Sequence, residues 1–320
     1  MNRLYLETAR LLTQIAPLVF ADETFALKGG TAINLFARDM PRLSVDLDLV
    51  FPDYTLPRDQ ALARIGEALR QAEARLIARG FTTHVPGASG AETKLLVRRG
   101  DIEVKIEVNF VLRGTVRPVQ RASLTTKARE TLLADLEIPV VSLEDMYGGK
   151  LVAALDRQHP RDLLDVMGLF ANEGITPGIR RAFVVYLASH NRPIHEVLFP
   201  SLRDVQGDYT HGFQGMTVEP VPLEALLAAR ERMVQELQQG LDENERRFLL
   251  SLAAGNPEWT RLDIAHLDQL PGIRWKMHNL EQLRKTNARK FAEQADALAA
   301  RLDSGSESDQ TRESGAGRES

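Results

Sequence analysis

The chain has 320 residues, of which 43% are hydrophobic and 26% charged, a composition typical of a soluble globular protein of about two domains. Its 40 basic and 44 acidic residues give a net charge of −4, which excludes a protein that is basic throughout and wraps nucleic acid. Cysteine is absent, so disulfide scaffolds, thiolate zinc sites and cysteine nucleophiles are excluded. No run approaches the ~20 apolar residues of a membrane span, and we expect a cytoplasmic protein without membrane contacts.

The N-terminal part alternates between helical and strand patterns. Apolar residues three or four apart indicate helices, and strict alternation of apolar and polar residues indicates half-buried strands. The expected elements are helices at 3–20, 32–36 and 58–79 and strands at 43–49, 93–97 and 102–108. We therefore expect an α+β domain with a mixed sheet over residues 1–138.

After this domain the strand patterns disappear and helical spacing continues. The expected helices are 143–157, 161–172, 178–189, 222–239, 243–254 and 276–301. These define an all-α domain over 139–302. The last segment, 303–320, is rich in Ser, Gly and Glu, with five acids against two arginines, and predicts a disordered acidic tail.

Two carboxylates on one expected strand give the sharpest chemical signal. Asp46 and Asp48 stand at i and i+2, so both point to the same face about 7 Å apart. A pair of this kind can hold Mg²⁺ or Mn²⁺, which prefer a few carboxylates together with substrate phosphates. A solvent-facing strand with two acids is the competing interpretation, and the pair alone does not exclude it.

A glycine pair lies upstream of these carboxylates. Gly29, Gly30 and Thr31 stand between a short apolar segment and a helix start, where backbone N–H groups attract phosphate. The competing interpretation is a plain strand-to-helix turn. Because fifteen residues separate Thr31 from Asp46, one helix and a return strand would bring phosphate site and metal site together. On the later strand, Glu107 is our choice for a third metal ligand.

These motifs resemble the AbiEii/AbiGii toxin family, a branch of the DNA polymerase β-like nucleotidyltransferases. The resemblance is carried by four ordered stretches over about residues 20–170: 29–31 (GGT), 42–48 (RLSVDLD), 104–109 (VKIEVN) and 148–165, which includes GGKLVAALDR and PRDLLD. Family members act as toxins of type IV toxin–antitoxin systems in abortive infection and phage defence, and the similar MenT toxins add nucleotides to tRNA. The family's fold implies a polymerase β-like domain followed by a helical domain.

The resemblance also implies roles for single residues. Asp46 and Asp48 correspond to the family's metal carboxylates, with Glu107 standing where an aspartate is usual. Gly29, Gly30, Thr31, Ser44 and Lys150 form the implied nucleotide-binding set. The implied lysine and distal aspartate are Lys150 and Asp165, where Asp165 either orients Lys150 or accepts a proton from the attacking hydroxyl.

Taken without the resemblance, the helical residues have simpler interpretations. Lys150 can be a surface lysine, and Arg161 with Asp165 has the i, i+4 spacing of an exposed salt bridge. We expect Arg161 and Asp162 to be structural.

The function that follows is transfer of a nucleoside monophosphate from an NTP to RNA, with tRNA as the expected acceptor, which blocks translation. Two basic segments suit such an acceptor: residues 94–129 with net charge +6 and residues 274–290 with net charge +5, the latter containing Trp275 and His278. The alternatives are nucleotidylation of a protein or small molecule, and a non-catalytic GTP-binding toxin. A separately encoded antitoxin that forms no stable complex is the further partner that the resemblance implies.

Overall fold

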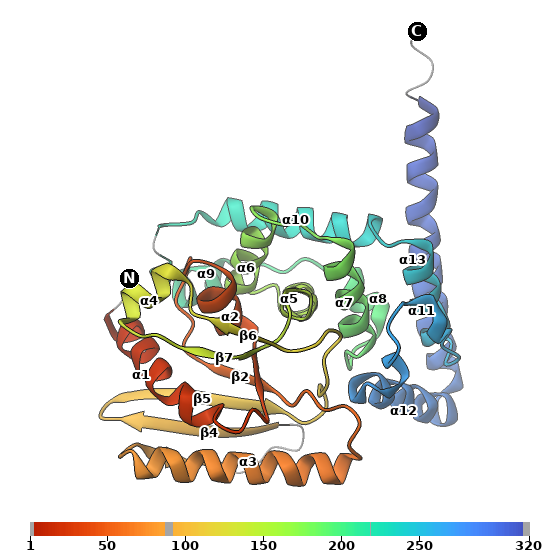
Figure 1. Ribbon diagram of the computed structural model, residues 1–320. Helices are drawn as coiled ribbons and strands as arrows, with labels where there is room; N and C mark the ends of the chain where they lie inside the picture. Colours follow the sequence, from red (N-terminus) through yellow and green to blue (C-terminus); the bar gives the residue numbers. More distant parts are fainter. Residues whose placement is uncertain (1–2, 87–91, 218, 316–320) are drawn as a thin grey trace.

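The computed structural model of the chain describes residues 3–86, 92–217 and 219–315 (Figure 1). Its N-terminal half is built on one seven-stranded mixed sheet with the order β3-β4-β5-β2-β1-β7-β6. The strands are β1 Ala26–Lys28, β2 Leu47–Val50, β3 Thr82–His84, β4 Glu92–Arg99, β5 Ile102–Asn109, β6 Gln120–Ser123 and β7 Glu137–Val140. The expected α+β class with a mixed sheet and a helical C-terminal part is confirmed.

Helices surround the sheet and make up the C-terminal half. The N-terminal half contains α1 Arg3–Val19, α2 Gly29–Ala32, the π-helical turn η1 Ile33–Ala37, α3 Arg58–Ala78 and α4 Thr126–Leu132. The rest contains α5 Leu143–Arg157, α6 Pro160–Phe170, α7 Pro177–Ala188, α8 Ile194–Leu198, α9 Gln206–Gly212, α10 Leu223–Gln239, α11 Glu243–Ala253, η2 Trp259–Arg261, η3 Leu267–Gln269, α12 Pro271–Thr286 and α13 Ala288–Gly315. No helix in the described ranges is long and apolar enough to cross a membrane.

The central strands place three charged residues side by side. Strand β2 runs antiparallel to β1 and parallel to β5, so Asp48 pairs with Lys28 on one side and with Glu107 on the other. The alternate positions Leu47 and Leu49 are fully buried. The alternation in the sequence therefore puts the acids on the polar face of the sheet, as expected.

Strand β2 begins later than its alternating pattern predicts. The expected strand was 43–49, but Arg42 forms an isolated bridge with Thr217 and the Leu43 N–H donates to the Met216 carbonyl at 3.4 Å. This segment therefore pairs with a distant part of the chain before it joins the sheet. Asp46 consequently lies just before β2, while Asp48 lies within it.

Helix α5 connects the two halves of the molecule. It begins where the Ser142 hydroxyl accepts a hydrogen bond from the Asp145 N–H, a normal N-cap. It packs against α2 on the sheet side and against α6, α7, α8 and α10 on the other, and Figure 1 shows it end-on among these helices. This placement brings Lys150 of α5 next to the glycines of α2.

Two expectations about the C-terminal part were wrong in detail. The single helix expected at 276–301 is two helices, because the chain breaks at Asn287, whose side-chain oxygen accepts from the Lys290 N–H and starts α13. Helix α13 then continues to Gly315, although residues 303–320 were expected to be disordered; residues 316–320 lie outside the described ranges. Leu298 and Leu302 are buried and anchor the helix, and extension of an existing helix costs little. Its end projects from the body of the molecule (Figure 1).

Candidate active site

A cavity of about 360 Å³ lies where the central strands meet α2, α5 and α7. Four of the predicted site residues line it, namely Gly29, Gly30, Asp48 and Lys150. Its polar wall also includes Lys28, Asp145, Asp156, Arg157, Tyr186 and His190. The sheet and the helical part therefore both contribute to this site, which is the candidate active site.

The two glycines leave room for side chains from the following strand segment. Gly29 has φ +73°, and a Cβ there would lie 2.3 Å from Oδ2 of Asp48. A Cβ on Gly30 would lie 2.7 Å from Nη2 of Arg42. Both distances are far shorter than real contacts, so any larger residue would displace the carboxylate or the guanidinium. Glycine is needed at both positions because Asp48 and Arg42 pack directly on this backbone.

Thr31 and Ser44 support the site from behind the glycines. Thr31 is completely buried, its hydroxyl donates to the Asp46 carbonyl at 2.5 Å, and it lies 3.0 Å from the Ser44 hydroxyl. A hydroxyl has one proton, and in Thr31 that proton is committed to the backbone of Asp46. In this arrangement Thr31 positions the Asp46 segment, while the cavity wall is formed by the glycine backbone.

Asp48 and Glu107 are neighbours with opposite electrostatic environments. Burial raises the pKa of Asp48, and the charges of Asp46 and Glu107 raise it further against the opposing effect of Lys28. Burial also acts to raise the pKa of Glu107, but hydrogen bonds from Lys94 and Lys105 outweigh it and lower that pKa. The lysine nitrogens lie 2.9 and 3.2 Å from the Glu107 carboxylate. Two close lysines thus favour the charged form of Glu107, whereas burial disfavours the charged form of Asp48.

A divalent cation would favour the ionised form of Asp48, which burial disfavours. The charge of Asp46 acts on the Asp48 carboxyl and raises its pKa, and hard cations with substrate phosphates suit two such neighbouring carboxylates. Glu107 fits less well, because lysines hold it and because Lys105 also lies 3.9 Å from Asp46. Within the described ranges, no three His, Asp or Glu side chains form a complete metal-ligand set. The residues present fit a metal held by two carboxylates and completed by substrate.

Lys150 and Asp165 form the centre of a buried ion cluster beneath the cavity. The Lys150 nitrogen lies 2.9 Å from Asp165 and 2.8 Å from Asp162. Arg42 donates to both oxygens of Asp165, at 2.9 and 2.7 Å, and Asn34 donates to one of them at 3.0 Å. The basic groups outweigh burial and hold the pKa of Asp165 far below its usual range. Asp165 is therefore ionised, enclosed and fully engaged by donors.

Several residues of this cluster were not singled out from the sequence. Asp162 was expected to be structural, and it shares Lys150 with Asp165 and also binds Arg157 at 2.9 Å. Asp165 contacts Arg42 and Lys150, not the Arg161 that lies four residues before it. The signal for Arg42 was its place at the start of the RLSVDLD motif, and for Lys28 its place just before the glycine pair. Asn34 gave no signal, since its role depends on the π-helical turn.

The basic segments are less available to a partner than their charge suggests. Lys276 is buried, donates to the carbonyls of His190 and Arg192, and has a pKa lowered by burial to about 8. Lys285 and Arg289 form ion pairs with acids of their own helices. The net charge of residues 274–290 is therefore partly used for folding and for helix surface pairs.

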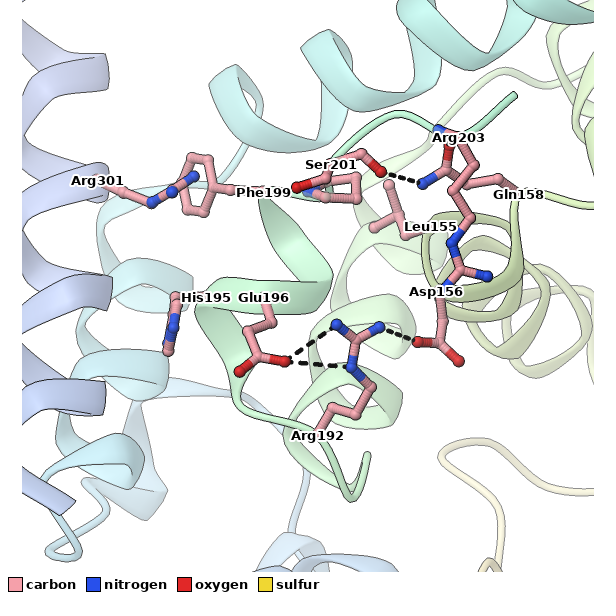
Figure 2. A pocket seen from close by; sticks show the side chains of 11 residues that line it. Leu155, Asp156, Gln158, Arg192, His195, Glu196, Phe199, Ser201, Arg203 and Arg301 are labelled. Atoms are coloured by element: carbon pink, nitrogen blue, oxygen red, sulfur yellow. Dashed lines mark hydrogen bonds and ion pairs between the residues drawn. The ribbon is translucent and has the colours of Figure 1, made fainter. Parts of the chain in front are cut away.

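A second cavity, also of about 360 Å³, lies on the far side of Asp156 between α8 and α13 (Figure 2). Arg192 joins Asp156 and Glu196 across its middle, at 2.5 and 3.0 Å, and Arg301 reaches over the ring of Phe199. None of the predicted site residues lines it. Because Gly29, Gly30 and Asp48 line the first cavity and not the second, the first cavity is the candidate active site.

Comparison with known proteins identifies the family of the chain. The model of the nucleotidyl transferase AbiEii toxin family, of type IV toxin–antitoxin systems, matches residues 10–279. The chain belongs to this family. The match spans the glycine pair, the carboxylates, the buried ion cluster and most of the helical part. The AbiEii assignment makes the chain a nucleotidyltransferase toxin, a class of enzyme that uses an NTP and a divalent metal and is paired with an antitoxin.

A solved structure shares the fold. The nucleotidyltransferase toxin MenT4 from Mycobacterium tuberculosis H37Rv superimposes with a TM-score of 0.56 at 21% identity, covering 86% of this chain and 94% of MenT4. At this identity the similarity concerns the fold, including the C-terminal helices of this AbiEii protein. A search of curated proteins gave no match.

Proposed function

We propose that this AbiEii toxin transfers a nucleoside monophosphate from an NTP to RNA in the cytoplasm, at the 3′ end of tRNA, in a Mg²⁺-dependent reaction that blocks translation. The observation that carries the proposal is the contact of Gly29 with Asp48. The backbone of a helix start and the Asp48 carboxylate lie together at one cavity that is also lined by Lys28 and Lys150, and Asp46 stands two positions before Asp48. Binding of a triphosphate requires backbone N–H groups and lysines, and binding of the metal beside it requires carboxylates.

The chain's own residues divide the work in this proposal. Gly29 and Gly30 offer backbone N–H groups of a first helical turn to the phosphates, since these groups have no partner within a helix. Lys28 and Lys150 offset phosphate charge at the cavity wall. Asp46 and Asp48 would hold Mg²⁺ or Mn²⁺, and the bound metal would stabilise charge on the attacking and leaving oxygens. Glu107, held by its lysines, fixes the electrostatic surroundings of Asp48.

In this scheme Asp165 orients its basic neighbours. Only 1% of its side chain is exposed, and its oxygens accept from Arg42, Asn34 and Lys150. This enclosure supports an orienting role toward Lys150 and Arg42 over a role as proton acceptor for the attacking hydroxyl. Asp46, with 41% of its side chain exposed, is the carboxylate that is open to the hydroxyl of the acceptor.

The decisive experiment follows label from each α-³²P-labelled NTP into total bacterial RNA. We expect Mg²⁺-dependent labelling by the wild type and none by Asp46→Ala, with sequencing of tRNA 3′ ends locating the added nucleotides. Labelling that resists nuclease but not protease would show a protein acceptor. Toxicity that survives Asp48→Ala would show a non-catalytic toxin. If the separately encoded antitoxin co-purifies with this toxin, the expectation that the two form no stable complex is wrong.

A further inference from the structure

A groove of about 230 Å³ opens between the sheet half and α12, separate from the two cavities already described. Aromatic and basic side chains line it, namely Tyr54, Arg58, Arg113, Arg274, Trp275 and His278. No acidic side chain is part of its described lining. The two basic segments singled out from the sequence thus meet here, through Arg113 of the first and Arg274 of the second.

Arg113 is the unusual member of this lining. Only 6% of it is exposed, and its Nε and Nη1 atoms are buried without a hydrogen-bond acceptor among the described residues. Buried guanidinium groups normally have such acceptors, because an unpaired buried charge is costly. Burial and the neighbouring Arg58 lower the pKa of Arg113, against the opposing effect of Asp53. The groove therefore holds a guanidinium with two nitrogens that donate to no acceptor in the described part of the chain.

The walls of the groove are built by contacts between the two halves of the molecule. Gly114 has φ +80°, and a Cβ there would lie 3.0 Å from both Tyr54 and Leu270. His266 stacks on Tyr54 with ring centroids 4.4 Å apart and hydrogen-bonds the Thr115 carbonyl at 2.9 Å. These contacts fix the segment that carries Arg113 against the entry to α12. The groove is a defined feature of the fold.

Trp275 supplies a surface for a flat ligand. It is 45% exposed and lies nearly parallel to His278, with ring centroids 5.8 Å apart and an angle of 22°. An exposed aromatic ring beside basic groups is the usual combination for binding an unpaired base and its phosphate. The two requirements, an anion for Arg113 and a ring for Trp275, are met by one nucleotide.

We propose that this groove binds a nucleotide near the 3′ end of a single-stranded acceptor RNA, with its base on Trp275 and its phosphate at Arg113. This proposal rests on the proposed function, for which it supplies the acceptor-binding subsite. Arg274 and Arg58 flank the phosphate at the surface.

The groove is close enough to the active site for this purpose. Arg113 stands six positions after Glu107, a separation of at most about 20 Å along an extended chain. Between them, the Asn109 side chain accepts from the N–H groups of Val111 and Leu112 and turns the chain at the end of β5. Leu112 lines the active-site cavity, so consecutive residues face the cavity and the groove.

Direct binding to the full-length protein tests the proposal without depending on catalysis. The chain has two tryptophans, so Trp259→Phe leaves Trp275 as the sole fluorophore, and Trp275→Phe leaves Trp259. Short single-stranded RNA should quench fluorescence in the first background and not in the second. By anisotropy of labelled RNA, Trp275→Leu and Arg113→Met should each weaken binding about tenfold, the effect of one lost stacking or charged contact. Arg289→Gln, which removes a paired arginine outside the groove, should have no effect.

The outcomes separate this proposal from the proposed function. RNA affinity within twofold of wild type in both Trp275→Leu and Arg113→Met overturns the groove, even if RNA is labelled in the transfer assay. If RNA binding requires Trp275 but no label is transferred to RNA, the RNA-binding role of the groove is supported, and the proposal that RNA is the acceptor of the reaction is overturned. If Arg113→Met unfolds by circular dichroism, the exposed Trp275 still decides the question. Displacement of quenching by an acidic peptide more strongly than by RNA would identify a protein ligand and overturn the proposal.

Discussion

Asp165 and Arg42 lie 123 positions apart in the chain and form a two-point ion pair in which both carboxylate oxygens accept from the same guanidinium. The side chains are 1% and 5% exposed, so the pair is shielded from solvent and salt. Because Arg42 packs on Gly30 and Asp165 also holds Lys150, the pair fixes the glycine turn relative to α5. The ion cluster is thus the support on which the candidate active site is assembled.

Removal of the Asp165 charge should therefore strongly destabilise the whole fold. Asp165→Asn leaves Arg42 and Lys150 buried with too few acceptors, and a broken buried pair of this kind costs about 3–5 kcal/mol. Urea unfolding should show this loss in the free energy of unfolding. Glu293→Gln, which breaks the exposed pair with Arg289, should change it by less than about 0.5 kcal/mol. Equal effects of the two substitutions would contradict the supporting role of the cluster.

The sequence predicts this site better than it predicts how the site is supported. The alternation around Asp46 and Asp48 and the glycine pair depend on local rules, so their placement followed from spacing. Arg42 and Asn34 contact Asp165 from more than a hundred residues away, and Asn34 also lies on a π-helical turn, which no local pattern specifies. Short strands such as β3, with three residues, are too brief for periodicity to reveal. The break at Asn287 depends on one capping side chain inside an otherwise helical pattern.

Asp48 and Glu107 are neighbours across β2 and β5, and replacing each by its amide should change the free energy of unfolding in opposite directions. The raised pKa of Asp48 means that its ionised form opposes folding. The stability of the fold therefore falls as pH rises through the folded-state pKa of Asp48. The lowered pKa of Glu107 means the reverse, a stabilisation present above its unfolded pKa and lost as pH falls through the folded-state pKa. Near pH 7, Asp48→Asn should stabilise the fold by about 1 kcal/mol and Glu107→Gln should destabilise it by about 0.5 kcal/mol.

Measured below the unfolded-state pKa values of about 4, both differences should shrink, because the carboxyls are then protonated in the unfolded chain. Chemical denaturation near pH 7 and below about pH 4 gives the sign of the stability change for each variant. If both variants change the stability in the same direction near pH 7, the electrostatic environments of Asp48 and Glu107 are not opposite.

Mg²⁺ should stabilise the wild-type protein through the carboxylate pair. A ligand that binds only the native state adds stability, by about 2.7 kcal/mol at a hundredfold excess over its dissociation constant. Thermal unfolding with and without Mg²⁺ should show this shift in wild type and not in Asp48→Asn. Retention of the shift in Glu107→Gln would show that Glu107 is not a required ligand, as its lysine contacts suggest. A shift that survives in Asp48→Asn would exclude the proposed metal site.

Gly29→Ala should lower activity because it displaces Asp48. The new Cβ would meet Oδ2 of Asp48 at 2.3 Å, and φ +73° adds backbone strain of about 1–2 kcal/mol. Gly80→Ala is the matched control, because φ is +81° there and no atom lies within 4 Å of the new Cβ. Both variants should lose this backbone-strain energy, and Gly29→Ala should lose further stability because it displaces Asp48. Only Gly29→Ala should lose more than about tenfold in kcat, as expected when a group is displaced from its reactive position. Equal activities of the two would show that Gly29 serves the turn alone.

Thr31 should act on the reaction through the backbone of Asp46. Its hydroxyl is completely buried and donates to the Asp46 carbonyl at 2.5 Å, so Thr31→Val leaves that acceptor unpaired and frees the segment that carries the carboxylate. We expect kcat to fall about tenfold or more, because Asp46 loses its fixed position, while the dissociation constant of the NTP measured without metal changes less than about twofold. Thr31→Ser keeps the hydroxyl and should restore most of kcat. A large loss of metal-free NTP affinity in Thr31→Val, with kcat retained, would instead assign the hydroxyl to the phosphates.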